Sequence, residues 1–215
     1  ALAAQADYGA DGQGKADEYA FSFNGDAASA ATNLFALGAD GAKGDAISLF
    51  KAAGGSLYGA TAKDGAHLFE LSVSNAGETR GQVTFSLLKP IWHDDATNPN
   101  DAQPLSLGKG LASLDCTIFD ADGDSRTLSL DMAALGGRIE IRDDGPRVKG
   151  EVKADDITAA AVDETYLADK SGKPTDTAVL DVRAAFAAQA DYGADGQGKA
   201  DEYAFSFAED AASAT

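Results

Sequence analysis

The amino-acid sequence predicts an all-β fold, an antiparallel β-sandwich-like repeat domain with short helical pieces. Three observations lead to this prediction. Apolar and polar residues alternate along several short segments, which is the periodicity of a half-buried strand. Gly-rich and Asp-rich stretches separate these segments, as hairpin turns do. A peptide near the start, Ala3 to Phe23, returns unchanged as Ala187 to Phe207, which is typical of a repeat.

The alternation assigns the expected strands in chain order. Residues 18–23 (EYAFSF) place three aromatic side chains on one face. Three pairs of apolar segments then follow, each joined by a turn rich in Gly or Asp: 46–50 with 56–60, 67–73 with 82–88, and 113–119 with 126–132. Residues 138–142 (RIEIR) predict a further strand. The Ala-rich segments 27–31 and 182–190 predict short helices, because alanine is the strongest helix former.

The duplicated peptide suggests how the chain is organised. We expect residues 1–146 to form the body of one repeat. Residues 147–215 are expected to hold the joint between repeats and the opening part of the next, truncated repeat. Pro146 would end a strand and stiffen the joint, since proline lacks an N–H and fixes φ. Both copies of the peptide are predicted to be ordered strands, with the second copy less well packed.

Charge and composition exclude several classes of function. Thirty-five acidic against 17 basic side chains give a formal net charge of −18, which disfavours binding to nucleic acid and to anionic membranes. No apolar run approaches the roughly 20 residues that span a bilayer, so no membrane insertion is expected. The single cysteine excludes an internal disulfide, and two histidines leave little for a transition-metal site.

The densest acidic cluster lies in the turn FDADGDS, which contains Asp120, Asp122 and Asp124. Carboxylates this close repel one another unless a cation lies among them, and calcium prefers oxygen ligands. The turn is not an EF-hand loop, because both of its flanks are predicted strands rather than helices. The alternative is a turn in which the aspartates cap backbone N–H groups.

Further acids are candidate metal ligands in turns and at the expected joint, where an ion could tie two units together. Alternatively, each of these acids is an exposed residue of a turn that binds no metal. These candidates are Asp11, Asp94, Asp101, Asp143, Asp144, Asp163 and Glu164. The pair His93–Asp94 raises the possibility of catalysis, but no nucleophile motif accompanies it. We therefore expect that the protein is not an enzyme.

The order of these motifs resembles a known repeat. YGADG and YAFSF, then HLFELSV and VTFSLL, then IWH and NPND, then FDADGDS and RDDGP follow one another along the chain. This order resembles the tandem repeat, of the roughly 143-residue type, of large type I-secreted RTX (repeats-in-toxin) adhesins of Gram-negative bacteria. The match runs from about Ala6 to Pro146. The glycine-rich nonapeptide of the RTX β-roll is not present in the sequence.

The resemblance implies a protein that is secreted to the bacterial cell surface and whose repeats fold with external calcium. It implies a spacer that projects a distal ligand-binding region in adhesion or biofilm formation, with neighbouring repeats of the same chain as partners. The alternative is a ligand-binding module of the adhesin, which would recognise a glycan or a surface protein through the loop from Trp92 to Asp101. By position, the implied calcium ligands are Asp11, Asp120, Asp122, Asp124, Asp143 and Asp144.

Overall fold

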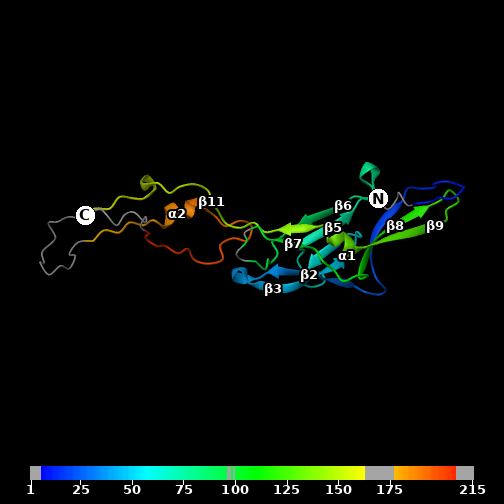
Figure 1. The fold of residues 1–215 in the computed structure, drawn as a ribbon, viewed down its shortest axis with the longest axis horizontal. Helices are drawn as coiled ribbons and strands as arrows, with labels where there is room; N and C mark the ends of the chain where they lie inside the picture. The colour runs from blue at the N-terminus through cyan, green and yellow to red at the C-terminus, as the bar shows by residue number, and fades with distance from the viewer. Residues whose placement is uncertain (1–5, 96–97, 99, 163–176, 207–215) are drawn as a thin grey trace. The chain divides into compact units, whose positions relative to one another are not determined.

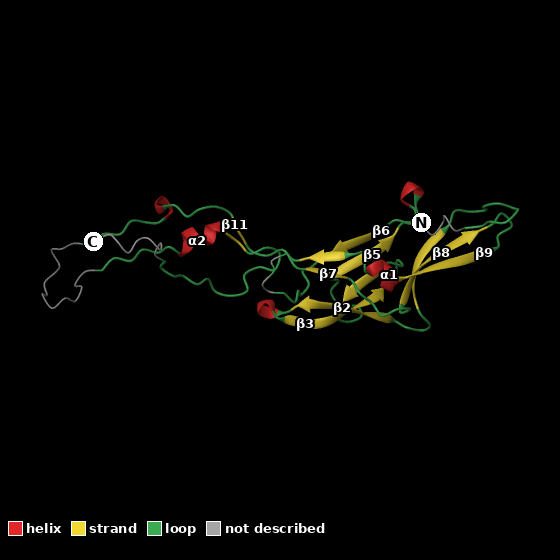
Figure 2. Ribbon diagram, viewed as in Figure 1, coloured by secondary structure: helices red, strands yellow, loops and turns green. Residues whose placement is uncertain are grey.

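The computed structural model describes residues 6–95, 98, 100–162 and 177–206. Most of its regular structure is β-strand in antiparallel sheets, and its helices are few and short (Figure 2). The predicted all-β class is therefore confirmed. Contacts along the chain define two units, residues 1–143 with 197–215 and residues 144–196.

The larger sheet of the first unit has five antiparallel strands (Figure 1). Their order across the sheet is β2 (Ser29–Leu37), β3 (Lys43–Lys51), β4 (Leu57–Ala60), β5 (Phe69–Val73) and β6 (Val83–Leu87). The central strand β4 is buried along its whole length. In the β5–β6 hairpin, Leu71 lies opposite Phe85, which confirms the hairpin predicted from the two alternating segments.

The first unit also contains a three-stranded sheet. Its order is β1 (Glu18–Phe23), β8 (Ala112–Phe119) and β9 (Ser125–Asp131). Along β8 the residues alternate strictly between buried and half-buried, as the sequence period predicts. Phe21 of β1 lies opposite Leu114 of β8. Strands β8 and β9 form the hairpin predicted at residues 113–119 and 126–132, and its turn consists of residues 120–124.

Shorter elements lie between and after the strands of these two sheets. Strand β7 (Ala102–Pro104) pairs with β10 (Glu140–Arg142). The short helix α1 (Met132–Gly136) follows β9 directly, and the Asp131 carboxylate caps it by accepting from the Ala133 N–H at 2.9 Å. Two 3₁₀ turns, Ala39–Gly41 and Gly77–Thr79, lie between strands.

One apolar cluster contains residues from both sheets of the first unit. Phe21 and Leu114 come from the three-stranded sheet, and Leu49 and Phe69 come from the five-stranded sheet; all four are at most 4% exposed. Each large apolar side chain buried in this way contributes about 1.5–3 kcal/mol to stability. The connecting segments add Ile91, Leu105, Leu107, Met132 and Ile141.

The helix predicted at residues 27–31 is wrong. Ala30 and Ala31 pair with Leu49 and Ser48 in the β2–β3 ladder, and Ala30 is buried. Strand pairing and burial outweigh the helix preference of alanine, which is less than about 1 kcal/mol per residue. The Ala-rich segment near the C-terminus does contain a helix, α2 (Arg183–Gln189).

The second unit has little regular structure. Strand β11 (Arg147–Val148) pairs with β12 (Ala190–Asp191), a 3₁₀ turn covers Ala154–Asp156, and Ala185 of α2 is buried. In the part of the chain that the structure describes, no helix has the length and hydropathy needed to cross a membrane.

The two copies of the duplicated peptide differ in structure. In the first copy, residues 18–23 form β1, and Phe21 is fully buried. In the second copy, residues 202–206 form no strand, and Phe205 is fully exposed. The prediction of a strand here is therefore wrong for the described residues. Strand β1 is held by β8, whose other edge is already paired with β9, so β8 has no free edge for a second copy.

Candidate functional site

The turn between β8 and β9 is closed by backbone hydrogen bonds and by its own aspartates. The Asp120 N–H donates to the Asp124 carbonyl at 3.0 Å, and the Gly123 N–H donates to Asp120 Oδ1 at 3.1 Å. Gly123 has a φ of +99°, a conformation that residues with a Cβ rarely adopt. The Asp120 carboxylate therefore caps the turn, as in the alternative interpretation of this motif.

The same turn gathers three carboxylates. One oxygen from each of Asp120, Asp122 and Asp124 lies within 4.8 Å of the other two. Calcium binds oxygens at about 2.3–2.6 Å, so two ligands on opposite sides of one ion are about 5 Å apart. The three carboxylates can therefore contact a single ion while the turn keeps its backbone conformation.

The carboxyl groups of Asp120 and Asp122 also affect each other's protonation. A hydrogen bond with Asp122, then burial and the negative charge of Asp122, raise the pKa of Asp120. The same hydrogen bond lowers the pKa of Asp122. Two carboxylates at short range shift each other's pKa in opposite directions in this way, because their negative charges repel when both are ionised. A bound cation would relieve the same repulsion.

A pocket of about 180 Å³ opens beside this turn, and the loop before β1 forms its other wall. Asp7 from that loop and Asp120 and Asp124 from the turn line the pocket, and Arg126 is its one basic lining residue. The remaining lining residues are Tyr8, Gly9, Ile118 and Ser125. Sequence reasoning missed Asp7, because nothing local indicates which acid of the peptide faces a turn more than one hundred residues away.

Close backbone packing fixes the loop against the turn. The Gly14 N–H donates to the Phe119 carbonyl at 3.0 Å, and Gln13 forms an isolated bridge with Asp120. A Cβ added at Gly14 would lie 1.9 Å from the Asp120 carbonyl oxygen. Only glycine fits this approach. The loop and the turn are therefore one structural assembly.

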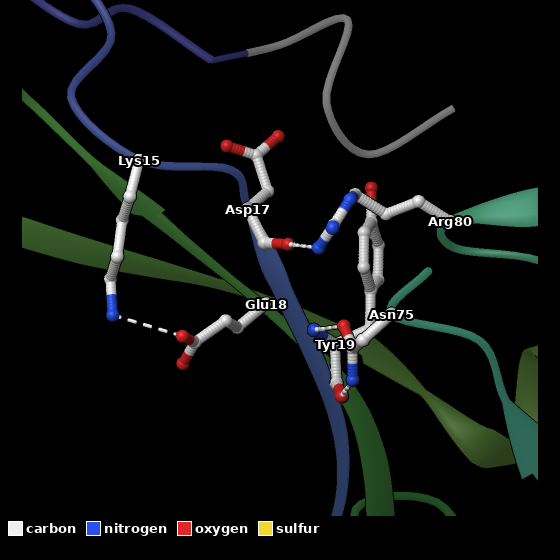
Figure 3. Close-up of polar contacts among 6 residues, drawn as sticks. All are labelled: Lys15, Asp17, Glu18, Tyr19, Asn75 and Arg80. Atoms are coloured by element: carbon white, nitrogen blue, oxygen red, sulfur yellow. Dashed lines mark hydrogen bonds and ion pairs between the residues drawn. The ribbon is translucent and has the colours of Figure 1, made fainter. Parts of the chain in front are cut away.

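Other polar contacts anchor the start of β1, as Figure 3 shows. The Asp17 carbonyl accepts from Arg80 Nη1 at 2.7 Å, and Asn75 bonds to both the N–H and the carbonyl of Tyr19. The buried Asp17 carboxylate accepts from the Tyr8 hydroxyl at 2.9 Å. Asp17 is thus satisfied by protein groups, and it holds the pocket wall at Tyr8 in place.

The other candidate ligands are dispersed. Asp11 and Asp94 are exposed, and Asp144 pairs with Arg147 at 2.5 Å. The backbone of Asp143 donates to the carbonyl of Asp101 at 2.7 Å. Asp163 and Glu164 lie outside the described residues. Among the acids that the structure describes, the one cluster of three is therefore that of the β8–β9 turn.

Comparison with protein families gives one match. A family described as a domain of unknown function, DUF5801, matches residues 1–133. The chain belongs to the DUF5801 family. The DUF5801 match includes β1 to β9 and both walls of the acidic pocket. No curated protein and no solved structure matches the chain.

The DUF5801 region also contains Trp92, the aromatic residue of the loop expected to bind a ligand in the alternative hypothesis. Trp92 packs edge-on against Phe35, with ring centroids 6.2 Å apart. Lys43 Nζ lies 3.6 Å from the Phe35 centroid and 4.8 Å from that of Trp92. A face of Trp92 is therefore in contact with a protein cation, which disfavours sugar stacking on that face.

Proposed function

We propose that the chain is a calcium-stabilised spacer repeat of a large bacterial surface adhesin of the type I-secreted RTX kind. It would project a distal ligand-binding region in adhesion or biofilm formation, with neighbouring repeats as its partners and no enzymatic activity. The observation that carries this proposal is the unchanged return of Ala3–Phe23 as residues 187–207. Duplication lengthens a spacer directly, whereas a single active site gains nothing from added length.

Calcium is the cofactor that the β8–β9 turn supports best. Its three carboxylates are close enough for one ion, and all three donors are the hard oxygens that calcium prefers. The pKa of Asp120 is raised first by its hydrogen bond with Asp122, then by burial and by the negative charge of Asp122, which a divalent cation would offset. In this proposal the two sheets form a sandwich-like body, and calcium fixes the turn to the loop before β1.

Thermal unfolding in calcium and in chelator tests the calcium site. A ligand that binds the native state alone raises the free energy of unfolding by about 2.7 kcal/mol at a hundredfold excess over Kd. We expect the double variant Asp122→Asn, Asp124→Asn to lose this increment and to keep its stability in chelator. Asparagine retains an oxygen for capping the turn, so the substitution removes charge more than hydrogen bonding.

A matched variant controls for the change in net charge. Asp26→Asn with Asp45→Asn removes two exposed acids away from the turn and should keep the whole calcium increment. An unchanged melting temperature of the wild type in calcium would refute the calcium site. An equal loss in calcium and in chelator for the turn variant would assign its aspartates to capping.

The spacer itself is tested against its alternative by a glycan array. A spacer repeat should bind no glycan selectively. Selective binding that is abolished by Trp92→Ala would replace the spacer with a ligand-binding module. That outcome would leave the result of the calcium experiment unaffected, so the two parts of the proposal can fail separately.

A further inference from the structure

A second polar cluster lies at the start of β7, away from the acidic turn. Three side-chain atoms of the described residues are buried and have no hydrogen-bond partner: His93 Nδ1, Asp101 Oδ2 and Gln103 Oε1. The His93 side chain is 8% exposed and that of Asp101 is 17% exposed. Buried polar atoms almost always find a partner in folded proteins, so three unpartnered atoms from one stretch of chain require an explanation.

The backbone places these side chains together. The Asp143 N–H donates to the Asp101 carbonyl, one step beyond the pairs Arg142–Ala102 and Ile141–Gln103 of the β7–β10 ladder. Asp101 therefore directly precedes β7 and its backbone extends the same ladder by one hydrogen bond. Because side chains of a strand alternate in direction, Asp101 and Gln103 project to the same face.

The distance between His93 and Asp101 excludes a direct hydrogen bond. His93 Nδ1 and Asp101 Oδ2 are 3.8 Å apart, whereas an N–H···O bond is at most about 3.2 Å long. The other oxygen, Oδ1, already accepts from the Ala102 N–H at 2.8 Å. Oδ2 is thus held beside the imidazole without bonding to it, and a buried carboxylate oxygen without a partner is unfavourable.

A metal ion would satisfy these atoms. Two ligands at about 2.1 Å from a tetrahedral ion are about 3.4 Å apart. His93 and Asp101 would need to approach by only a few tenths of an ångström. Asp101 would supply a negative charge to the ion, and Gln103 offers a neutral oxygen on the same face of β7.

We propose that His93, Asp101 and Gln103 form a metal site that takes a divalent first-row transition ion such as Zn²⁺, with water at the remaining position. Imidazole nitrogen is a good ligand for such ions, whereas calcium binds through oxygens. In this proposal Asp101 binds a transition-metal ion rather than calcium. It does not depend on the acidic turn or on the spacer function.

The two histidines of the chain make the site measurable in the intact protein. His67 is half-exposed, and its Nδ1 lies 2.7 Å from Glu70 Oε1, so it is an internal control. With ¹³C-labelled histidine and saturating calcium to occupy the acidic turn, we expect Zn²⁺ to shift the His93 ring signals at one equivalent. The His67 signals should move only at a higher concentration of Zn²⁺.

Calorimetric titration with Zn²⁺ in the same buffer tests the individual ligands. His93→Ala and Asp101→Asn should each weaken the affinity at least roughly tenfold, since even residues outside the ligand set change metal affinity by this factor. The matched controls His67→Ala and Asp94→Asn should retain the wild-type affinity. If a His93 variant does not fold, the titration of labelled wild-type protein still decides the question.

Three results would overturn the proposal. The His93 signals could remain unchanged in Zn²⁺, which would indicate that buried water satisfies the three atoms. Both histidines could respond equally, which would indicate surface binding alone. Calcium alone could shift the His93 signals and exclude Zn²⁺, which would make the cluster a calcium site.

Discussion

The duplicated peptide provides a matched pair of substitutions, Phe21→Ala and Phe205→Ala. The two phenylalanines have identical neighbours in sequence, but Phe21 is 0% exposed and Phe205 is fully exposed. Replacing Phe21 with alanine loses a transfer free energy of about 1.5–3 kcal/mol and leaves a cavity beside Leu114. Together these effects should lower the free energy of unfolding by about 3–5 kcal/mol. The same change at Phe205 should alter stability by less than about 0.5 kcal/mol.

Urea unfolding, followed by the fluorescence of the single tryptophan Trp92, measures both effects. Phe21→Ala should lower the midpoint without changing the slope, which indicates a change in stability alone. If Phe21→Ala is too unstable to study, Phe21→Leu should give a smaller loss of the same sign. Equal losses at the two positions would refute the conclusion that only the first copy is packed in the core.

The remaining predictions concern single contacts. Gly14→Ala should destabilise the protein by about 1–3 kcal/mol in urea unfolding, because its Cβ would meet the Asp120 carbonyl at 1.9 Å; a neutral result would show that the loop can move away from the turn. Asp131→Ala should cost about 1 kcal/mol through loss of the α1 cap, whereas Asp131→Asn should cost less. Burial, followed by the neighbouring Cys116 thiol, raises the pKa of Tyr19 from 10.0 to about 12. Folding therefore favours the neutral phenol. The contribution of Tyr19 to the free energy of unfolding is fully present below pH 10 and is lost as the pH rises toward 12. Tyr19→Phe should remove that part of the pH dependence in unfolding curves measured from pH 9 to 12.

Local sequence patterns predicted the hairpins well. Strands β8 and β9 are short, alternate clearly and are joined by a glycine-containing turn, so their pairing depends on neighbouring residues. The same locality explains why the cluster of Asp120, Asp122 and Asp124 could be predicted: residues in one tight turn are close in any fold. The backbone hydrogen bonds of that turn then determine which carboxylates converge.

Features that depend on distant residues were not predicted. The strand at residues 29–37 contains several alanines, and its ladder with β3 rather than its own composition makes it a strand. Asp7 lines the pocket in a loop that the Gly14 N–H ties to the Phe119 carbonyl, more than one hundred residues along the chain. Residues 202–206 also show that local sequence alone does not determine structure. They have the same sequence as residues 18–22, which form a strand because they pair with β8.

The pairing of β1 with β8 also determines the order in which this fold can be completed. Ser22 and Ser113 face each other across the two strands, yet they are 91 positions apart. During synthesis from the N-terminus, β1 emerges first and must wait, with Tyr19 and Phe21 uncovered, until the chain has grown past β8. In a chain that carries this peptide more than once, each newly formed β8 meets several identical strands. Loop closure favours pairing of each β8 with the copy of β1 that is fewest residues away along the chain. A long spacing between copies therefore disfavours pairing of β8 with the wrong copy.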